Sequence, residues 1–274
     1  MTPHQIALND GTQIPQIGFG VFLIPEEETQ RAVGLALEAG YRHIDTASIY
    51  GNEKGVAQAI TATGLPREDL YITTKLWNED QGTATTRPAL EASLERLGLD
   101  YVNLYLIHWP VPSRNLYRET WEVLEEAAND GLTRSIGVSN FLEEHLTALA
   151  AMGGRIPVLN QIEVHPTLPQ HDLVATNTAM GIATEAWSPL GRGADLEMPE
   201  VTAIASRIGA TPAQVILAWH LQRDRIILPK SVTPERIREN LAAAEIALSP
   251  ADLQALDDLD TGVRVGPDPA SFIG

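Results

Sequence analysis

The sequence predicts an α/β protein, a (β/α)8 barrel with an N-terminal β-hairpin and an active site at the carboxyl ends of its strands. Eight short apolar runs alternate with amphipathic segments of helical period. Eight such units in 274 residues match the usual length of this barrel. No linker or shift in composition divides the chain, so we expect one domain over residues 1–274.

The eight expected strands are short, apolar and rich in β-branched residues. They cover residues 17–20, 42–46, 70–75, 102–109, 133–138, 157–162, 182–187 and 225–229. Three segments between or after them carry helix boundary signals. Segment 26–40 ends on a glycine, whereas 211–222 and 249–259 both begin with a hydroxyl residue followed by proline. All three segments are therefore predicted helices.

The first residues of the chain bear on the choice between two folds. Residues 4–15 contain the turn sequence Asn9-Asp10-Gly11, which predicts a hairpin that plugs the bottom of the barrel. The competing fold is a doubly wound dinucleotide-binding sheet, which requires a G-x-G-x-x-G fingerprint after its first strand. Residues 18–23 have the first two glycines but Leu23 at the third position, so the barrel is favoured.

Composition and charge exclude several classes of function. The net charge of −17 argues against a nucleic-acid or anionic-membrane partner, because both need a basic surface. The chain has no cysteine, hence no disulfide, thiol nucleophile or thiolate metal site. The N-terminus lacks the features of a signal peptide, and no apolar run approaches the roughly 18 residues of a membrane span. We therefore expect a soluble, cytoplasmic protein.

Polar residues follow the expected strands at the points where these strands end. Asp45 ends the second strand, with Tyr50 in the loop beyond it, and Lys75 and His108 end the third and fourth. Because chemistry in such barrels is located at the carboxyl ends of the strands, we expect these side chains to meet there. The later strands carry Ser139 and Asn140, Asn160 and Gln161, Trp187 and Ser188, and Lys230 and Ser231.

The first four of these residues suggest acid catalysis on a carbonyl group. An ammonium such as Lys75 favours the phenolate form of a nearby tyrosine, and a carboxylate such as Asp45 holds the ammonium in place. Such a tyrosine can be an acid near neutral pH and protonate a carbonyl oxygen, with hydride as the partner reagent. Taken singly, each residue also has an ordinary interpretation as a helix cap, a packed aromatic, a surface lysine or a structural histidine. Their occurrence on successive strands favours the functional interpretation.

Residues 229–240 predict a phosphate site. Thr233 is a suitable N-cap, Pro234 suits the first helical position, and Lys230 and Arg236 add positive charge to the helix N-terminus. The loop after the eighth strand is a common phosphate-binding position in this fold. Arg236 could grip a ribose phosphate through two parallel hydrogen bonds. The alternative is a capped surface helix with two ordinary basic residues.

Two other chemistries have weaker support. The seven histidines show no metal-binding spacing, and Glu163 and His165 stand two apart without an evident third ligand, so we expect no metal. Serine hydrolysis lacks its G-x-S-x-G elbow.

The chain resembles the aldo-keto reductase superfamily over essentially its whole length. The segments GYRHIDTASIYGNE, LYLIHWP, IGVSNF with NQIEVHP, and PKSVTPERIREN carry the resemblance. It is closest to small prokaryotic members such as the 2,5-diketo-D-gluconate reductases. The resemblance implies a (β/α)8 barrel that binds NADPH without a dinucleotide-binding domain of the doubly wound type, and a monomer.

The resemblance also implies a role for each matching residue. The catalytic tetrad corresponds to Asp45, Tyr50, Lys75 and His108. Residues that hold the carboxamide of the cofactor correspond to Ser139, Asn140 and Gln161, and the aromatic that stacks on the nicotinamide corresponds to Trp187. The remaining expected cofactor contacts are Ser188, Leu190, Lys230, Ser231, Val232, Thr233, Arg236, Glu239 and Asn240.

Departures from the family pattern bear on the substrate. Phe22 stands where many relatives have tryptophan, and both the loop 191–200 and the C-terminal tail are short. These features suggest an open pocket for reactive aldehydes, dicarbonyls, keto sugars or aromatic ketones. Its expected lining is Val21, Phe22, Ile49, Trp77, Trp109 and Phe272.

The expected function is thus the NADPH-dependent reduction of a small carbonyl compound to an alcohol, with Tyr50 as the proton donor. One alternative is a largely non-catalytic, NADP(H)-sensing regulatory barrel. It is disfavoured by the intact tetrad and by the lack of an interaction tail. A metal-assisted hydrolase is the other alternative, and the sequence supplies no ligand set for it.

Overall fold

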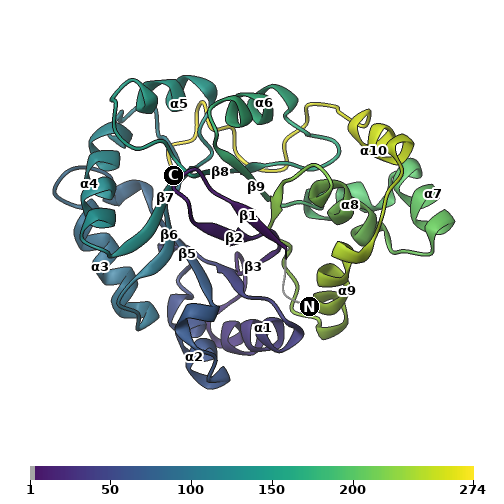
Figure 1. The fold of residues 1–274 in the computed structure, drawn as a ribbon, viewed down its shortest axis with the longest axis horizontal. Coiled ribbons are helices and arrows are strands. Elements are labelled where there is room, and N and C mark those ends of the chain that lie inside the picture. The colour runs from purple at the N-terminus through teal and green to yellow at the C-terminus, as the bar shows by residue number, and fades with distance from the viewer. Residues whose placement is uncertain (1–3) are drawn as a thin grey trace.

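A computed structural model describes residues 4–274 and has the predicted barrel architecture (Figure 1). Eight parallel strands form one sheet in the order of the chain, and helices surround this sheet. The strands are β3 (Gly18–Gly20), β4 (His43–Asp45), β5 (Tyr71–Leu76), β6 (Val102–Ile107), β7 (Thr133–Ser139), β8 (Leu159–Glu163), β9 (Ala183–Trp187) and β10 (Ile226–Ile227). Each lies within one or two residues of an expected strand.

The first and last strands meet and close the barrel. Ile227 donates its backbone N–H to the carbonyl of Gln16 at 2.9 Å, and Ile17 forms a parallel bridge with Ile227. The backbone N–H of Gly20 reaches the carbonyl of Pro229 at 3.3 Å. These bonds pair the open edges of β3 and β10.

The outer helices cover the sheet with apolar faces. They are α1 (Glu26–Ala39), α2 (Glu53–Thr63), α3 (Thr86–Leu97), α4 (Tyr117–Asn129), α5 (Glu143–Ala150), α6 (His171–Ala179), α7 (Pro199–Ile208), α8 (Pro212–Leu221), α9 (Pro234–Ala242) and α10 (Pro250–Asp257). The helix α1 ends at Gly40, whose φ of 113° suits only glycine. Capping boxes start α8 at Thr211 and α10 at Ser249. The three predicted helices are thereby confirmed.

Short 3-10 helices complete the secondary structure of residues 4–274. They are η1 (Ser48–Tyr50), η2 (Arg67–Asp69), η3 (Asn78–Asp80), η4 (Gly191–Glu197) and η5 (Ala243–Glu245). The first and fourth matter for the site, because η1 carries Tyr50 and η4 forms the loop after β9.

The N-terminal hairpin lies across the centre of the ring in Figure 1. Its strands β1 (Gln5–Ala7) and β2 (Gln13–Pro15) pair antiparallel around Gly11, which has a φ of 85°. Ile14 is fully buried and belongs to an apolar cluster inside the barrel with Leu104 and Leu159. The predicted hairpin is therefore present, and it fills one end of the barrel with apolar side chains.

Among residues 4–274, no single helix is long and apolar enough to cross a membrane. The helices α7 and α8 are long and apolar enough only when taken together, and a bend of 94° separates them.

Candidate active site

A buried ion pair forms the base of the site at the carboxyl ends of β4 and β5. Lys75 has no exposed side-chain surface, and its Nζ lies 2.6 Å from Asp45 Oδ1 and 2.8 Å from the carbonyl oxygen of Thr46. A buried ammonium needs such partners, because an isolated charge in a low-dielectric interior is strongly unfavourable. Burial alone lowers the pKa of Lys75, but Asp45 and Tyr50 raise it above its ordinary value. Lys75 is therefore charged at neutral pH.

Tyr50 lies directly beside this ammonium, which is 5.1 Å from the centre of its ring. The two are brought together by η1, where Ser48 Oγ donates a hydrogen bond to the carbonyl of Lys75 at 3.0 Å. Buried Asn52 supports the same loop by donating to the carbonyls of Val21 and Ile24. The loop that carries Tyr50 is thus fixed at both ends.

The protonation state of Tyr50 corrects the sequence-based expectation. Burial raises the pKa of Tyr50 more than Lys75 lowers it, so the net pKa is above the ordinary value for tyrosine. The expected effect of Lys75 has the right sign, but it does not bring this phenol near neutrality in the structure. Tyr50 therefore carries its proton throughout the neutral pH range.

His108 follows β6 and faces Tyr50 across the mouth of the barrel. The two ring centres are 5.7 Å apart, and the ring centre of Trp77 is 5.3 Å from that of the imidazole. Burial, with a further contribution from Lys75, holds the pKa of His108 well below its usual range. The imidazole is neutral at neutral pH, so one ring nitrogen carries a proton that it can donate in a hydrogen bond.

Beneath these four residues, the expected Gln161 contacts a buried acid that the sequence analysis did not single out, Glu185. Gln161 Nε2 donates to Asp45 Oδ2 at 2.9 Å and to Glu185 Oε2 at 2.7 Å. Glu185 is fully buried, and burial together with the charge of Asp45 raises its pKa to about 8. Its place in the middle of β9, among apolar residues, was the only available signal, since an acidic residue there requires a partner.

The other expected cofactor residues at the strand ends lie together but already bond to one another. Asn140 Nδ2 donates to the carbonyl of His108 and to Ser139 Oγ, each at 3.0 Å. Trp187 Nε1 donates to Asn140 Oδ1 at 2.8 Å, and Ser139 Oγ donates to the carbonyl of Gln161. The residues expected to hold the carboxamide therefore form one hydrogen-bonded network with Trp187 around the ends of β7, β8 and β9. Ser188 and Leu190 follow β9 and are half-buried.

The predicted phosphate segment lies between β10 and α9. Lys230 and Arg236 are exposed, while Ser231, Val232 and Thr233 are half-buried; of the adenine-side pair, Glu239 is exposed and Asn240 is buried. Within the described chain, Thr233 makes no side-chain capping bond, although it occupies the N-cap position. Ser231 Oγ instead accepts from the backbone N–H of Thr233 at 3.1 Å. Arg31 of α1 also reaches this segment through the carbonyl of Val232, at 3.4 Å, a neighbour that sequence reasoning missed.

Aromatic residues flank His108 and Tyr50. Phe22 is 45% exposed and contacts Tyr50 at 5.0 Å between ring centres, while Phe272 contacts Trp109 at 4.4 Å and Trp77 at 6.4 Å. Ile49 is exposed beside Tyr50. These residues lie around Tyr50 and His108.

Val21 differs from the other expected lining residues. Its side chain has no accessible surface and packs in the main core of the barrel. The structure therefore does not place Val21 on the lining, although its carbonyl accepts the hydrogen bond from Asn52.

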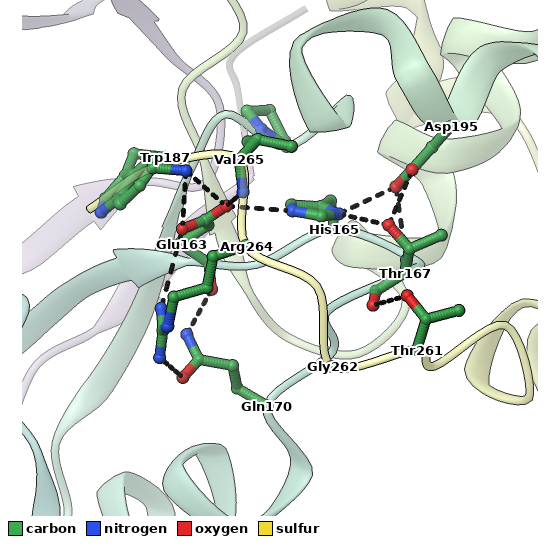
Figure 2. Close-up of polar contacts among 12 residues, drawn as sticks. Glu163, His165, Thr167, Gln170, Trp187, Asp195, Thr261, Gly262, Arg264 and Val265 are labelled. Carbon is green, nitrogen blue, oxygen red and sulfur yellow. Dashed lines mark hydrogen bonds and ion pairs between the residues drawn. The ribbon is translucent and has the colours of Figure 1, made fainter. Parts of the chain in front are cut away.

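A second polar cluster surrounds His165, at the end of β8 (Figure 2). Its ring nitrogens contact Glu163 at 3.2 Å and Asp195 at 2.9 Å. The pair Glu163 and His165 was considered as part of a metal site from sequence. Among residues 4–274, no group of three or more acidic or histidine side chains is arranged to hold a metal ion.

The fold and the site together define a (β/α)8 barrel that presents a tyrosine, a lysine–aspartate pair and a neutral histidine at one end. A profile of the aldo/keto reductase family matches residues 16–261. The chain belongs to this family, whose members are oxidoreductases.

Individual relatives match nearly the whole chain. An aldo-keto reductase of Mycolicibacterium smegmatis is 52% identical over 99% of this chain and 98% of its own length. Methylglyoxal reductase DkgA of Yersinia pestis is 48% identical over 97% and 96%, respectively. The crystal structure of a mutant of Gox0644 in complex with NADPH superimposes with a TM-score of 0.95, at 41% identity, over 99% of each chain.

Proposed function

We propose that this protein is an NADPH-dependent oxidoreductase that reduces aldehydes and ketones, such as dicarbonyls and keto sugars, to alcohols. One observation carries the proposal: the buried Lys75–Asp45 pair lies against Tyr50, and Tyr50 faces a neutral His108. In this arrangement Tyr50 can donate a proton, and His108 a hydrogen bond, to one oxygen atom. Lys75 places a positive charge beside the phenolate that Tyr50 becomes. A carbonyl group accepting hydride needs these three things.

The residues present fit NADPH by their chemistry. The exposed cations Lys230 and Arg236, with Arg31 nearby, surround the N-terminus of α9. Helix N-termini and guanidinium groups favour phosphate, so we assign the adenosine phosphate to this segment. The half-buried indole of Trp187 stands at the end of β9, beside Ser139, Asn140 and Gln161, and would hold the nicotinamide there. When bound, NADPH supplies hydride to the carbonyl carbon.

Tyr50 supplies the proton in this scheme. Its raised pKa keeps the phenol protonated at neutral pH, so the proton is available to the carbonyl oxygen as the carbon accepts hydride. The products are the alcohol and a phenolate, which Lys75 stabilises and which regains a proton from water. Asp45 acts through Lys75, because its carboxylate keeps the ammonium in place.

His108 orients the carbonyl oxygen. A neutral imidazole donates one hydrogen bond without adding a second positive charge next to Lys75. The low pKa of His108, caused first by burial and then by Lys75, maintains this state. His108 and Tyr50 then donate to the same oxygen, and both interactions strengthen as negative charge develops there.

The family membership and the named relatives support the proposal and guide the choice of substrate. Methylglyoxal, named for the relative from Yersinia pestis, is a small dicarbonyl. The first assay therefore mixes the protein, NADPH and methylglyoxal and follows the loss of nicotinamide absorbance, with product analysis for the alcohol. NADPH consumption that depends on the carbonyl compound supports the proposal. Tight NADPH binding without turnover of any aldehyde or ketone would instead favour a cofactor-sensing protein.

A further inference from the structure

The C-terminal tail is attached to the barrel through one buried carboxylate. Glu163, the last residue of β8, has no exposed surface, and its carboxylate accepts the backbone N–H groups of Val265 and Gly266. Arg264 Nη1 lies 3.6 Å from the same carboxylate. Figure 2 shows Arg264 and Val265 of the tail beside the carboxylate of Glu163. The tail thus contributes two N–H donors and one cation to a single acceptor.

His165 links this carboxylate to the loop after β9. Its Nε2 faces Glu163 at 3.2 Å, and its Nδ1 faces Asp195 Oδ2 at 2.9 Å. Burial opposes the charged imidazole, but the hydrogen bonds to the two carboxylates raise its pKa to about 9. At neutral pH, Glu163, Asp195, His165 and Arg264 therefore balance two negative charges with two positive charges. We call these four residues the tail clamp.

A second attachment reinforces the clamp. Thr167 Oγ1 donates to Asp195 Oδ1 at 2.8 Å, and the carbonyl of Thr167 accepts both the backbone N–H and the hydroxyl of Thr261. The loop after β8, the loop η4 and the start of the tail are consequently tied together. Charges held among hydrogen-bond partners in this way tolerate little displacement, because a shift would leave one of the buried groups unpaired.

Beyond the clamp, the tail returns to the active site. Gly266 is packed so tightly that an added Cβ would lie 2.3 Å from the indole of Trp187. Residues 267–271 form a turn in which the carbonyl of Asp268 accepts the backbone N–H groups of Ser271 and Phe272. Phe272 then packs against Trp109 and Trp77, and Trp77 contacts His108. With prolines at positions 267 and 269, the backbone has restricted freedom between the clamp and Phe272.

We propose that Glu163 is a positioning residue for the carbonyl substrate: through the tail clamp it fixes the tail, and with it Phe272, as one wall of the pocket beside His108. The inference rests on the proposed function, because it assigns a substrate to that pocket. The proposal predicts that the clamp affects the choice of substrate as well as the stability of the protein. A bulky aromatic aldehyde needs the wall formed by Phe272, whereas a small dicarbonyl makes little contact with it.

The steady-state test compares 4-nitrobenzaldehyde with methylglyoxal, using NADPH. Glu163→Gln keeps the size of the side chain but removes its charge. It should raise KM for the aromatic aldehyde about tenfold and leave kcat within about twofold, since a charge-assisted contact is lost away from the reacting atoms. KM for methylglyoxal should change much less. Glu91→Gln, which removes one partner of the exposed Arg87 ion pair on α3, serves as the control.

A double-variant cycle separates positioning from a purely structural role. Phe272→Ala should reproduce the KM effect, and adding Glu163→Gln to it should cause no further increase, since both act through the same wall. Additive effects, or equal effects on both substrates, would overturn the proposal. If Glu163→Gln does not fold, the same KM comparison is made with Asp195→Asn and Arg264→Met, which change the other partners in the clamp.

Hydrogen exchange tests the clamp without turnover. Amides of residues 264–274 should exchange faster in Glu163→Gln than in the parent protein, while those of β5 and β6 should not change. Unchanged exchange in the tail would contradict the inference. If the parent protein reduces no carbonyl compound, the proposed function fails, but the exchange result still decides whether Glu163 fixes the tail.

Discussion

Gln161 Nε2 lies 2.7 Å from Glu185 Oε2 and donates its second hydrogen to Asp45, so one amide group joins the two buried carboxyl groups. Asp45 remains paired with Lys75, whereas Glu185 is pushed towards its protonated form. The interior of the barrel beneath the site therefore contains two acids in different states. Asp45 is the carboxylate that most raises the pKa of Lys75 and so keeps it charged.

Tyr50→Phe tests the proton donor. General acid catalysis contributes about 10²–10⁴-fold, so this variant should lose at least about 100-fold in kcat with methylglyoxal. NADPH binding, measured by fluorescence, should remain within about twofold, since the missing hydroxyl is assigned to the substrate oxygen. Tyr101→Phe is the matched control, because Tyr101 lies under Arg67 and Arg134, away from the Lys75 pair. Near-normal turnover of Tyr50→Phe would show that another group donates the proton.

Arg236→Ala tests the cofactor phosphate. A lost charge-assisted contact should weaken NADPH binding by about tenfold or more. NADH lacks the 2′-phosphate of the adenosine ribose, so its binding should change by less than about threefold. Arg238, which is also exposed, stands two residues further along α9 and so points to another side of the helix. Arg238→Ala should leave both affinities near those of the parent protein. If Arg236→Ala lost equal affinity for NADPH and NADH, the phosphate of NADPH could not be assigned to this segment.

Glu185→Gln tests the buried acid through the pH dependence of stability. The pKa of Glu185 is raised from 4.5 to about 8 in the folded protein. The folded state therefore binds this proton more tightly than the unfolded state does, and its stabilising contribution is lost as pH rises from 4.5 towards 8. We expect the free energy of unfolding in urea to fall between pH 5 and pH 8 in the parent protein. In Glu185→Gln this fall should be smaller, by more than about 1 kcal/mol. Parallel pH profiles for the two proteins would contradict this protonation state.

Gly266→Ala tests the contact between the tail and Trp187. The added Cβ would overlap the indole and approach Glu163 Oε2, and overpacking of this kind costs about 1–3 kcal/mol. Thermal unfolding should report the loss as a lower Tm. Gly34→Ala is the control, since nothing lies within 4 Å of its added Cβ on α1. That control should be more stable than the parent protein by about 0.5–1 kcal/mol, because glycine is unfavourable within a helix. A Tm of Gly266→Ala at or above that of the parent would refute the contact.

The predictions from sequence succeed where local patterns determine structure. The eight strands follow from short apolar runs, and the ends of α1 and α8 follow from Gly40 and Thr211. The meeting of Asp45 and Lys75 follows from the barrel itself, since parallel strands align their carboxyl ends. These features depend on neighbouring residues or on a known architecture, so one sequence is sufficient.

Other features depend on contacts across the chain that no local pattern contains. The bridge from Asp45 through Gln161 to Glu185 joins three strands, and Arg31 reaches the phosphate segment from 201 residues away. The pKa of Tyr50 was misjudged because desolvation depends on the surrounding packing, which is invisible in the sequence. The burial of Val21 was missed for the same reason.

The bonds that join Gln16 to Ile227 and Gly20 to Pro229 have a consequence for how the chain acquires its structure. They connect segments separated by more than two hundred positions, and contacts of such long range form slowly because the intervening chain must first be ordered. During synthesis, β3 and β9 both remain edge strands until β10 (Ile226–Ile227) is available to pair with them. Over that interval these two edges are the parts of the sheet most open to incorrect pairing, and chaperone binding would be most useful there.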